Sequence, residues 1–423
     1  MQPTAVVLNM FYTGLEIARS LGGHGIPVLG LTAQRGVYGN ATRFAKTQFV
    51  PDSKLEPEAL LTSLLGIGRS LPCRGILFPT RDHDLVFLDR FRAQLEPYFS
   101  LVMPGSEPLE TCLNKWETFV SARNAGIDAP WCVAVEDQAG LESALAGLAY
   151  PCVLKPVAAH HWREAGRWAL VGGRKAIVVR SEAELLAEYS QITRAEKRVL
   201  IQQLVPGPDS NLEIVGCYID SNSKWAAGFT AQKLAQSPEG FGTGCILRTA
   251  DRNALFERTR KLLEAMRFTG MAEVEYKWDA KSGKYYLIEI NPRPWDQLAL
   301  GRVSGVDLSL LAYADHAAMP APALNPDTAV HKWIAEDAFV IESLRLAWRR
   351  DRRFWSLLKL AAGHRTYAIW SPRDPLPFLS YLTQGLPTVL GGLLRAALAK
   401  ALPAGNQNGR PASLLSKPAR ERR

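Results

Sequence analysis

The chain has 423 residues, 47% hydrophobic and 22% charged, which is enough for two or three domains with substantial cores. No apolar run reaches the roughly 18 residues that a transmembrane helix needs, and the N-terminus lacks the basic segment of a secretory signal peptide, so we expect neither. The six cysteines are scattered without a CxxC pair. This pattern favours free thiols in a reducing cytosol over a disulfide framework.

The net charge of +9 is concentrated near the C-terminus. Residues 341–423 contain 15 basic and 4 acidic residues, whereas the preceding 340 residues contain 35 basic and 37 acidic residues. An electrostatic argument for binding a membrane or a nucleic acid therefore concerns only the last fifth of the chain.

The first hundred residues alternate apolar strands with amphipathic helices. This alternation predicts a parallel, doubly wound sheet over residues 1–108. Such sheets bind ligands beyond the carboxyl ends of their strands. Arg81 and Asp82 directly follow the strand GILFPT and are therefore candidate substrate contacts, with helix capping by Asp82 and Asp84 as the alternative. The expected strands cover 4–9, 26–31, 48–50 and 75–80, and the expected helices cover 14–21 and 57–70.

From about residue 109 the pattern changes, and we expect a second domain over 109–320, with lobes over 109–205 and 206–320. In the segment SEAELLAEY, Ser181 is a predicted helix N-cap and Glu184 completes its capping box. Residues 158–175 lack clean periodicity and predict a mobile loop with hairpin character. The other expected elements are helices over 114–126, 253–268 and 300–318, strands over 151–157 and 198–207, an antiparallel pair LEIVGCYI and WAAGFTAQKL, and a hairpin around AKSG.

The hairpin carries carboxylates inside apolar strands. Side chains alternate along a strand, so Glu289 shares a face with Asn291, and Glu273 shares one with Glu275. If the two strands pair around AKSG, these oxygen ligands meet on one surface, where they suit Mg²⁺. The alternative is a surface hairpin with solvated acids. The hairpin register is open at this point, so Glu273 rivals Glu275 as a ligand.

Five ordered motifs resemble the ATP-grasp superfamily, and more narrowly its carboxylate–amine ligase-like branch. They are NKWETF, PCVLKP, LIQQLVPGPD, VEYK and IEINPR, and IEINPR preceded by VEYK is the most specific. The resemblance covers about residues 5–315. It implies a mixed α/β and α+β ATP-grasp fold that follows the N-terminal doubly wound sheet.

The resemblance also implies roles for individual residues. Two Mg²⁺ ions, with Mn²⁺ as an alternative, would be held by Glu275, Glu289 and Asn291. The phosphates of ATP would contact Lys115 and Lys155, with Lys175 as a weaker match, and Lys233 and Arg293 would face the transferred phosphoryl group. Adenine would be read by Gln202, Gln203, Leu204 and Val205, and ribose by Asp209. Trp295 and Asp296, just past the metal strand, are further candidate substrate contacts.

One segment departs from the family pattern. The phosphate-covering loop of the family is often short and rich in glycine, whereas the matching stretch 157–175 is long and contains His160 and His161. These histidines are either acceptor ligands or loop residues without a role.

The implied activity is an ADP-forming carbon–nitrogen ligase that joins a carboxylate to an amine through an acyl phosphate. Its partners would be small molecules in the cytoplasm, with a homodimer as the expected assembly. One alternative is a carboxylase-type enzyme that activates bicarbonate, although no biotin-acceptor pattern occurs. The other is a non-catalytic nucleotide-binding scaffold at a membrane.

The region 321–402 is predicted to be a basic helical extension, followed by a disordered tail over 403–423. Within it, residues 335–362 combine Trp348 and Trp355 with many arginines, and the apolar residues from Ile341 to Leu358 follow helical spacing. Peripheral contact of residues 341–402 with the inner face of a membrane is one interpretation. Helices packed on the catalytic body with solvated arginines are the other. No nucleic-acid-binding signature occurs, so we expect no nucleic-acid partner.

Overall fold

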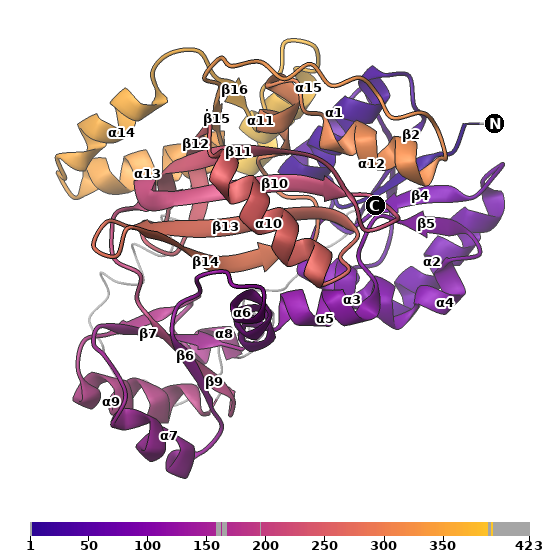
Figure 1. Cartoon of the computed structure of the whole chain (residues 1–423). Helices are drawn as coiled ribbons and strands as arrows, with labels where there is room; N and C mark the ends of the chain where they lie inside the picture. Colours follow the sequence, from indigo (N-terminus) through magenta and orange to yellow (C-terminus); the bar gives the residue numbers. More distant parts are fainter. Residues whose placement is uncertain (1, 158–161, 163–166, 195, 388–390, 392–423) are drawn as a thin grey trace, which may run out of the picture.

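The computed structural model describes residues 2–157, 162, 167–194, 196–387 and 391 (Figure 1). The predicted disordered tail and the pair His160 and His161 lie outside the described residues. The described part contains three sheets, with five, four and seven strands. No described helix is long and apolar enough to cross a membrane.

The N-terminal sheet is parallel throughout, as the alternation of strands and helices predicts. Its strand order is β3-β2-β1-β4-β5, so the connections run in opposite directions on either side of the β1/β4 pair. This reversal opens a crevice at the carboxyl ends of β1 and β4, where Asn9 and Thr80 lie. The strands are β1 (Ala5–Leu8), β2 (Val28–Thr32), β3 (Lys46–Phe49), β4 (Gly75–Phe78) and β5 (Phe99–Leu101). The helices are α1 (Tyr12–Gly23), α2 (Pro57–Ser70), α3 (Asp82–Arg90) and α4 (Arg92–Leu95), with a 3₁₀ turn at Tyr38–Ala41.

The four-stranded sheet forms a small lobe that stands apart from the rest in Figure 1. Its strands are antiparallel in the order β6-β9-β7-β8. Ser181 caps α9 as predicted, since its hydroxyl accepts from the Glu184 N–H at 3.3 Å. The elements are β6 (Cys132–Val135), α7 (Gln138–Leu145), β7 (Cys152–Pro156), α8 (Arg167–Leu170), β8 (Ile177–Val179), α9 (Glu182–Ile192) and β9 (Val199–Gln203).

The seven-stranded sheet has the order β14-β13-β10-β11-β12-β15-β16. Leu255 and Leu262 of α10 pack against one face, while α11 and α12 contribute to the core on the other. Its strands are β10 (Leu212–Ile219), β11 (Trp225–Ser237), β12 (Thr243–Ala250), β13 (Gly270–Asp279), β14 (Lys284–Asn291), β15 (Lys332–Ile334) and β16 (Thr366–Tyr367). The remaining elements of this part are α5 (Ser106–Leu113), α6 (Lys115–Asn124), α10 (Asn253–Ala265), α11 (Leu298–Val303), α12 (Leu308–His316) and the 3₁₀ turn Asp209–Asn211.

The single helix expected over 300–318 is wrong, because the structure has two helices there. Gly305 adopts φ +84° between α11 and α12, a conformation that ends a helix and that glycine tolerates best. Asp307 then caps α12 by accepting the Leu310 N–H at 3.1 Å.

The C-terminal extension is part of the body, because it contributes a strand to the large sheet and residues to the core. Its strand β15 extends the large sheet next to β12, and Ile369 and Tyr381 lie in the same core as α1 and α12. The helical stretch expected over 335–362 is divided into two helices by a turn at Arg349–Arg352. The helices of the extension are α13 (Glu336–Trp348), α14 (Arg353–Ala361) and α15 (Leu376–Ser380), followed by a π-helical turn at Tyr381–Gly385.

A buried ion pair fixes the extension to the N-terminal sheet. Asp374 is 0% exposed and accepts from Arg19 Nε at 3.0 Å, from Thr42 Oγ1 at 2.6 Å and from the Arg43 N–H at 3.1 Å. Arg19 also donates to the Ile369 carbonyl at 2.7 Å. All of these partners lie far from Asp374 in sequence, so only the tertiary fold brings them together.

We predict that Asp374→Ala lowers the free energy of unfolding by about 3–5 kcal/mol, because it leaves the buried Arg19 guanidinium without its counter-ion. Urea unfolding of the full chain measures this loss. The neighbouring Arg373 is exposed, so Arg373→Ala should stay within about 0.5 kcal/mol. Equal stability of the two variants would contradict the prediction.

Candidate functional site

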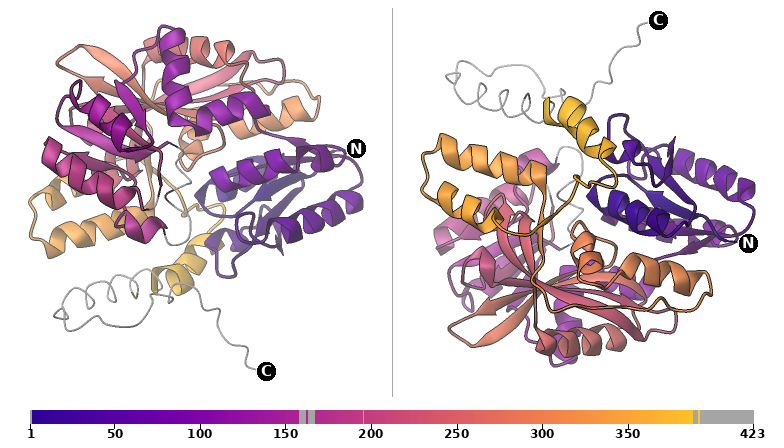
Figure 2. Two further views of the ribbon diagram at one scale, coloured as in Figure 1. Left: turned by 90° about the horizontal axis from the view of Figure 1, so that it is seen from below. Right: turned by 90° about the horizontal axis from the view of Figure 1, so that it is seen from above.

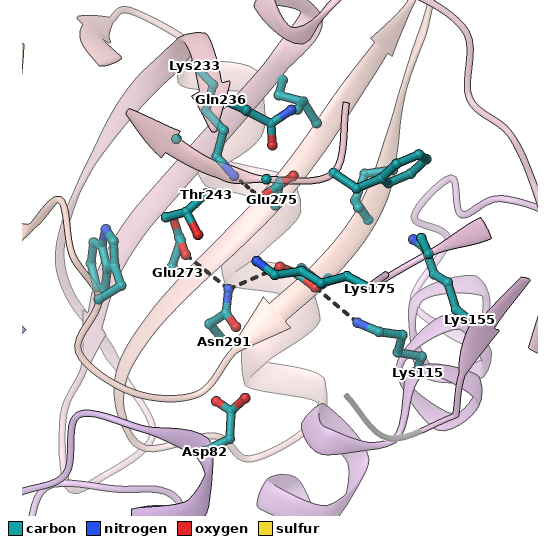
Figure 3. Close-up of a pocket in the computed structure, with 18 of the residues that line it drawn as sticks. Asp82, Lys115, Lys155, Lys175, Lys233, Gln236, Thr243, Glu273, Glu275 and Asn291 are labelled. Carbon is teal, nitrogen blue, oxygen red and sulfur yellow. Dashed lines mark hydrogen bonds and ion pairs between the residues drawn. The ribbon is translucent and has the colours of Figure 1, made fainter. Parts of the chain in front are cut away.

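A cavity of ≈ 630 Å³ lies where the small lobe, the large sheet and the N-terminal sheet meet. Its walls come from β7 and β9 of the lobe, from β11, β13 and β14 of the large sheet, and from the turn between β4 and α3. Figure 3 shows charged side chains from all three parts directed toward this space. Of the predicted site residues, every one except Asp209 lines the cavity.

The acidic hairpin has the register that places its carboxylates together. Glu275 pairs opposite Glu289, and Glu273 opposite Asn291. The Asn291 amide donates to Glu273 at 3.0 Å and to Glu289 at 3.4 Å (Figure 3). Glu273 and Glu275 are both buried, so these are not the solvated acids of a surface hairpin. Burial, reinforced by the neighbouring Glu275, raises the pKa of Glu273 to about 7.

Two lysines balance the negative charge of the carboxylates on the acidic strands. Lys115, the first residue of α6, lies 3.0 Å from Glu289 and is the main reason that the pKa of this carboxyl is lowered. Lys233 of β11 forms a buried ion pair with Glu275. Burial alone would lower the pKa of Lys233, but Glu275 outweighs it and raises that pKa. The cluster is therefore a compact arrangement of alternating charges at one end of the cavity.

Lys155 of β7 differs from the other two lysines. Its side chain is only 9% exposed, and it has no hydrogen bond or ion pair with any described residue. Burial, and then the positive charge of Lys115, lower its pKa to about 8. A buried ammonium without a partner is unfavourable unless an anion is supplied. The residue is thus suited to bind an anionic group that enters the cavity.

The acidic hairpin fits a divalent cation. No three His, Cys, Asp or Glu side chains among the described residues are grouped as a complete metal site. Glu275, Glu289 and Asn291 nevertheless provide hard oxygen ligands on one surface. Mg²⁺ is commonly held by one or two carboxylates while phosphate oxygens and water complete its shell. The residues present therefore match Mg²⁺ bound together with a phosphate, not a closed protein site.

Another part of the cavity wall is formed by the end of β9 and the residues after it. The residues predicted to read adenine, Gln202, Gln203, Leu204 and Val205, all lie there. Gln202 is buried, and its Oε1 atom has no hydrogen-bond partner among the described residues. The Gln203 side chain instead accepts from the Trp131 N–H at 3.1 Å. Gln202 can therefore accept a hydrogen bond from a ligand amino group at this end.

Asp209 is not on the cavity wall. Its carboxylate lies 3.5 Å from the Gly240 N–H and so contacts the loop between β11 and β12. That loop, with Gly240, Phe241 and Gly242, lines the cavity, although it is not among the residues predicted from the sequence. The segment GFGTG could have indicated this loop as a phosphate contact, because closely spaced glycines allow backbone N–H groups to approach phosphate. Of the loop expected over 157–175, the described residues Trp162 and Lys175 line the cavity.

The N-terminal sheet contributes the third wall through Arg81 and Asp82. Arg81 is held by Asp52 and Asp84, each at 3.0 Å, and Asp84 also accepts the Arg81 N–H at 3.0 Å. Asp84 therefore caps α3, as the alternative interpretation proposed for it. Asp82 does something else, because its carboxylate accepts from Arg293 Nε at 2.6 Å. This pair joins the N-terminal sheet to the end of the acidic hairpin.

The two residues past the acidic strand also face this wall. Trp295 is almost fully buried and stacks on Phe229, with ring centroids 6.0 Å apart. Its indole N–H has no hydrogen-bond partner among the described residues. Asp296 accepts from Thr13 Oγ1 at 2.9 Å. Both residues line the cavity, as does Arg293.

Comparison with known proteins identifies the fold. Residues 243–314 match the family model described as carbamoyl-phosphate synthase L chain, ATP binding domain. The ADP complex of purK, an N5-carboxyaminoimidazole ribonucleotide synthetase, superposes with a TM-score of 0.60 and 18% identity over 77% of this chain and 80% of that chain. The chain has the ATP-grasp fold. The predicted fold class is thereby confirmed.

Curated relatives of this ATP-grasp chain are ligases. D-aspartate ligase of Enterococcus faecium (strain Aus0004) is 21% identical over 248 residues, which is 57% of this chain and 58% of the relative. D-alanine–D-alanine ligase of Ectopseudomonas mendocina (strain ymp) is 24% identical over 195 residues, 43% of this chain and 56% of the relative. The chain thus spans somewhat more than half the length of the curated relatives that it matches.

Proposed function

We propose that the protein is an ATP-dependent ligase that joins a carboxylate to an amine and releases ADP and phosphate. The observation that carries the proposal is Lys155, a largely buried lysine that has no ion pair or hydrogen bond with any described residue and that lines the same cavity as the acidic hairpin. A nucleotide triphosphate with Mg²⁺ supplies the anion that Lys155 lacks and the cation that the carboxylates suit. The ligase relatives support the reaction class.

In the proposed site, the nucleotide lies along the cavity from β9 to the acidic hairpin. Gln202 accepts from the adenine amino group, and the backbone of Leu204 and Val205 lies beside the base. Lys115, Lys155 and Lys175 hold the phosphates. The hairpin ligands Glu275, Glu289 and Asn291 hold Mg²⁺, which neutralises phosphate charge when bound. Glu273 hydrogen bonds to Asn291 and so orients this ligand.

The reaction proposed for this arrangement has two steps. A carboxylate oxygen of the first substrate attacks the γ-phosphorus, the bond to the β-phosphate oxygen breaks, and ADP is the leaving group. The amine nitrogen then attacks the carbonyl carbon of the acyl phosphate, loses a proton and expels phosphate. Lys233 and Arg293 lie where they can stabilise the charge on the transferred group.

The substrates bind, on this proposal, between the acidic hairpin and the N-terminal sheet. Trp295 offers an apolar wall and an indole N–H that has no hydrogen-bond partner among the described residues, and Asp296 offers a carboxylate for an ammonium group. Asp82 acts through its pair with Arg293, and Arg81 orients the turn that presents Asp82. The names of the two relatives, which act on D-aspartate and D-alanine, support amino acids as the substrate class. We further propose a cytoplasmic protein, where ATP is supplied, that forms a homodimer.

The test is ADP formation with pooled carboxylates and amines. We expect ADP only when a carboxylate and an amine are both present with Mg²⁺. ADP formation with bicarbonate and no amine would favour a carboxylase-type enzyme instead. Tight ATP binding without any turnover across the pools would favour the non-catalytic scaffold.

A further inference from the structure

The helices α13 and α14 form an antiparallel hairpin at the periphery of the molecule (Figure 2). Their inner faces belong to the core of the body, since Leu346 of α13 and Leu357 of α14 are buried in it. Phe339 and Phe354 pack against the same core. The extension therefore needs no further partner to bury its inner face.

The outer face of the hairpin is also apolar, whereas the solvent-exposed face of a helix is usually polar. Trp348 is 87% exposed and Trp355 is 66% exposed, and Leu344 and Leu358 are exposed beside them along the two helices. Leu344 and Trp348 are four residues apart, and Trp355 and Leu358 are three apart, so each pair shares a helix face. Tryptophan is enriched where one side of a surface is apolar and the other is wet, as at a bilayer interface.

The turn between the helices is strongly basic. Arg349, Arg350 and Arg352 are all exposed, and none has an ion pair with a described residue. Lys359 is exposed on α14 and is likewise without an ion pair in the described part of the chain. By contrast, the nearby Arg353 is held by Asp351 and Glu239. The unpaired cations and the two tryptophans together form a surface, here called the Trp–Arg tip.

The backbone at the Trp–Arg tip favours glycine, not arginine. Arg350 has φ +53°, and its N–H and that of Asp351 bond to the carbonyls of Ala347 and Leu346, which is the usual helix end with glycine. An arginine is strained in this conformation because its Cβ crowds the backbone, whereas glycine has no Cβ. A charged residue thus stands at a position where glycine would fit the backbone conformation better.

We propose that the Trp–Arg tip binds the surface of an anionic lipid bilayer. Exposed tryptophans supply apolar area for the headgroup region, and unpaired arginines supply attraction to anionic lipids, a combination typical of interfacial helices. Charge complementarity selects an anionic surface over a neutral one. Nucleic acid would use the arginines but leave the leucines and tryptophans without a role, and a second copy would bring like charges together.

Sedimentation of the full-length protein with vesicles tests this proposal. We expect binding to vesicles of phosphatidylcholine with about one-third phosphatidylglycerol, weaker binding to phosphatidylcholine alone, and release as the salt concentration rises. The triple variant Arg349→Gln, Arg350→Gly and Arg352→Gln should bind about fivefold more weakly for each arginine removed. Trp348→Ser with Trp355→Ser should also weaken binding.

The control removes three exposed basic residues elsewhere, by Arg180→Gln, Arg194→Gln and Lys197→Gln on the small lobe. It has the same net charge as the tip variant and should keep wild-type vesicle binding. All variants should keep wild-type ATP binding, because none of these residues lines the cavity. Equal vesicle binding by the tip variant and the wild type would overturn the proposal, as would no binding at all. Binding to duplex DNA, or dimerisation, that depends on the tip and occurs without vesicle binding would overturn it in favour of those partners.

Discussion

Glu289→Gln is expected to lower kcat for ADP formation by at least about 10²-fold. Loss of a residue that only orients a metal ligand commonly costs 10–100-fold, and loss of a ligand itself should cost more. Glu289 lies opposite Glu275 in the hairpin and 3.0 Å from Lys115, so the variant removes charge from the centre of the cluster. Steady-state ADP release, measured over a range of Mg²⁺ concentrations, gives both kcat and the apparent Mg²⁺ affinity.

A matched control separates this effect from a general change of charge. Glu264 is exposed on α10 and does not line the cavity, so Glu264→Gln should leave kcat and the Mg²⁺ dependence unchanged. Thermal unfolding of both variants shows whether the hairpin remains folded. A folded Glu289→Gln variant with full turnover would make the metal assignment wrong.

Lys155→Met is expected to weaken ATP binding about 10²-fold and at the same time to stabilise the protein without ligand. The first effect follows because the variant removes the buried cation that the phosphates require. The second follows because an ammonium group is costly to bury when, like that of Lys155, it has no ion pair or hydrogen bond with any described residue. Isothermal titration with ATP and Mg²⁺ measures the binding loss, and urea unfolding measures the stability.

The pH dependence gives the sign of the stability effect. Folding lowers the pKa of Lys155 from 10.5 to about 8. Each unit of this pKa shift corresponds to 1.36 kcal/mol, so at pH 7 the charged Lys155 lowers the free energy of unfolding of the wild type by up to about 3 kcal/mol. The penalty is full below pH 8 and disappears as the pH rises to 10.5. The advantage of Lys155→Met over the wild type should shrink in the same interval.

Lys197→Met is the control for these measurements, because Lys197 is exposed on the same lobe. It should change neither ATP affinity nor the dependence of stability on pH. A Lys155→Met variant that is less stable than the wild type at pH 7 would show that a partner compensates the buried ammonium.

The sequence alone determined the elements that depend on local patterns. The parallel sheet follows from short strands alternating with helices, and Ser181 caps its helix because a cap needs only nearby residues. Glu289 and Asn291 lie on the same face of their strand because side chains alternate with a period of two residues. The motifs VEYK and IEINPR resemble the ATP-grasp superfamily, and this resemblance predicted the ATP-grasp fold.

Only the tertiary structure decided which distant residues meet. It placed Lys115, Lys155 and Lys233 around one acidic hairpin, left Lys155 without an ion pair among the described residues, and brought the GFGTG segment to the same cavity. Hairpin register needs the paired strands, so it could not be read from one strand alone.

Tertiary structure likewise separated the roles of neighbouring carboxylates. Asp82 pairs with Arg293, 211 residues away, while Asp84 caps its own helix. Asp374 is tied to Arg19, 355 residues away, and so the extension is part of the body. Sequence patterns report which face of an element is apolar, but such pairings depend on how whole elements pack, which no local pattern encodes.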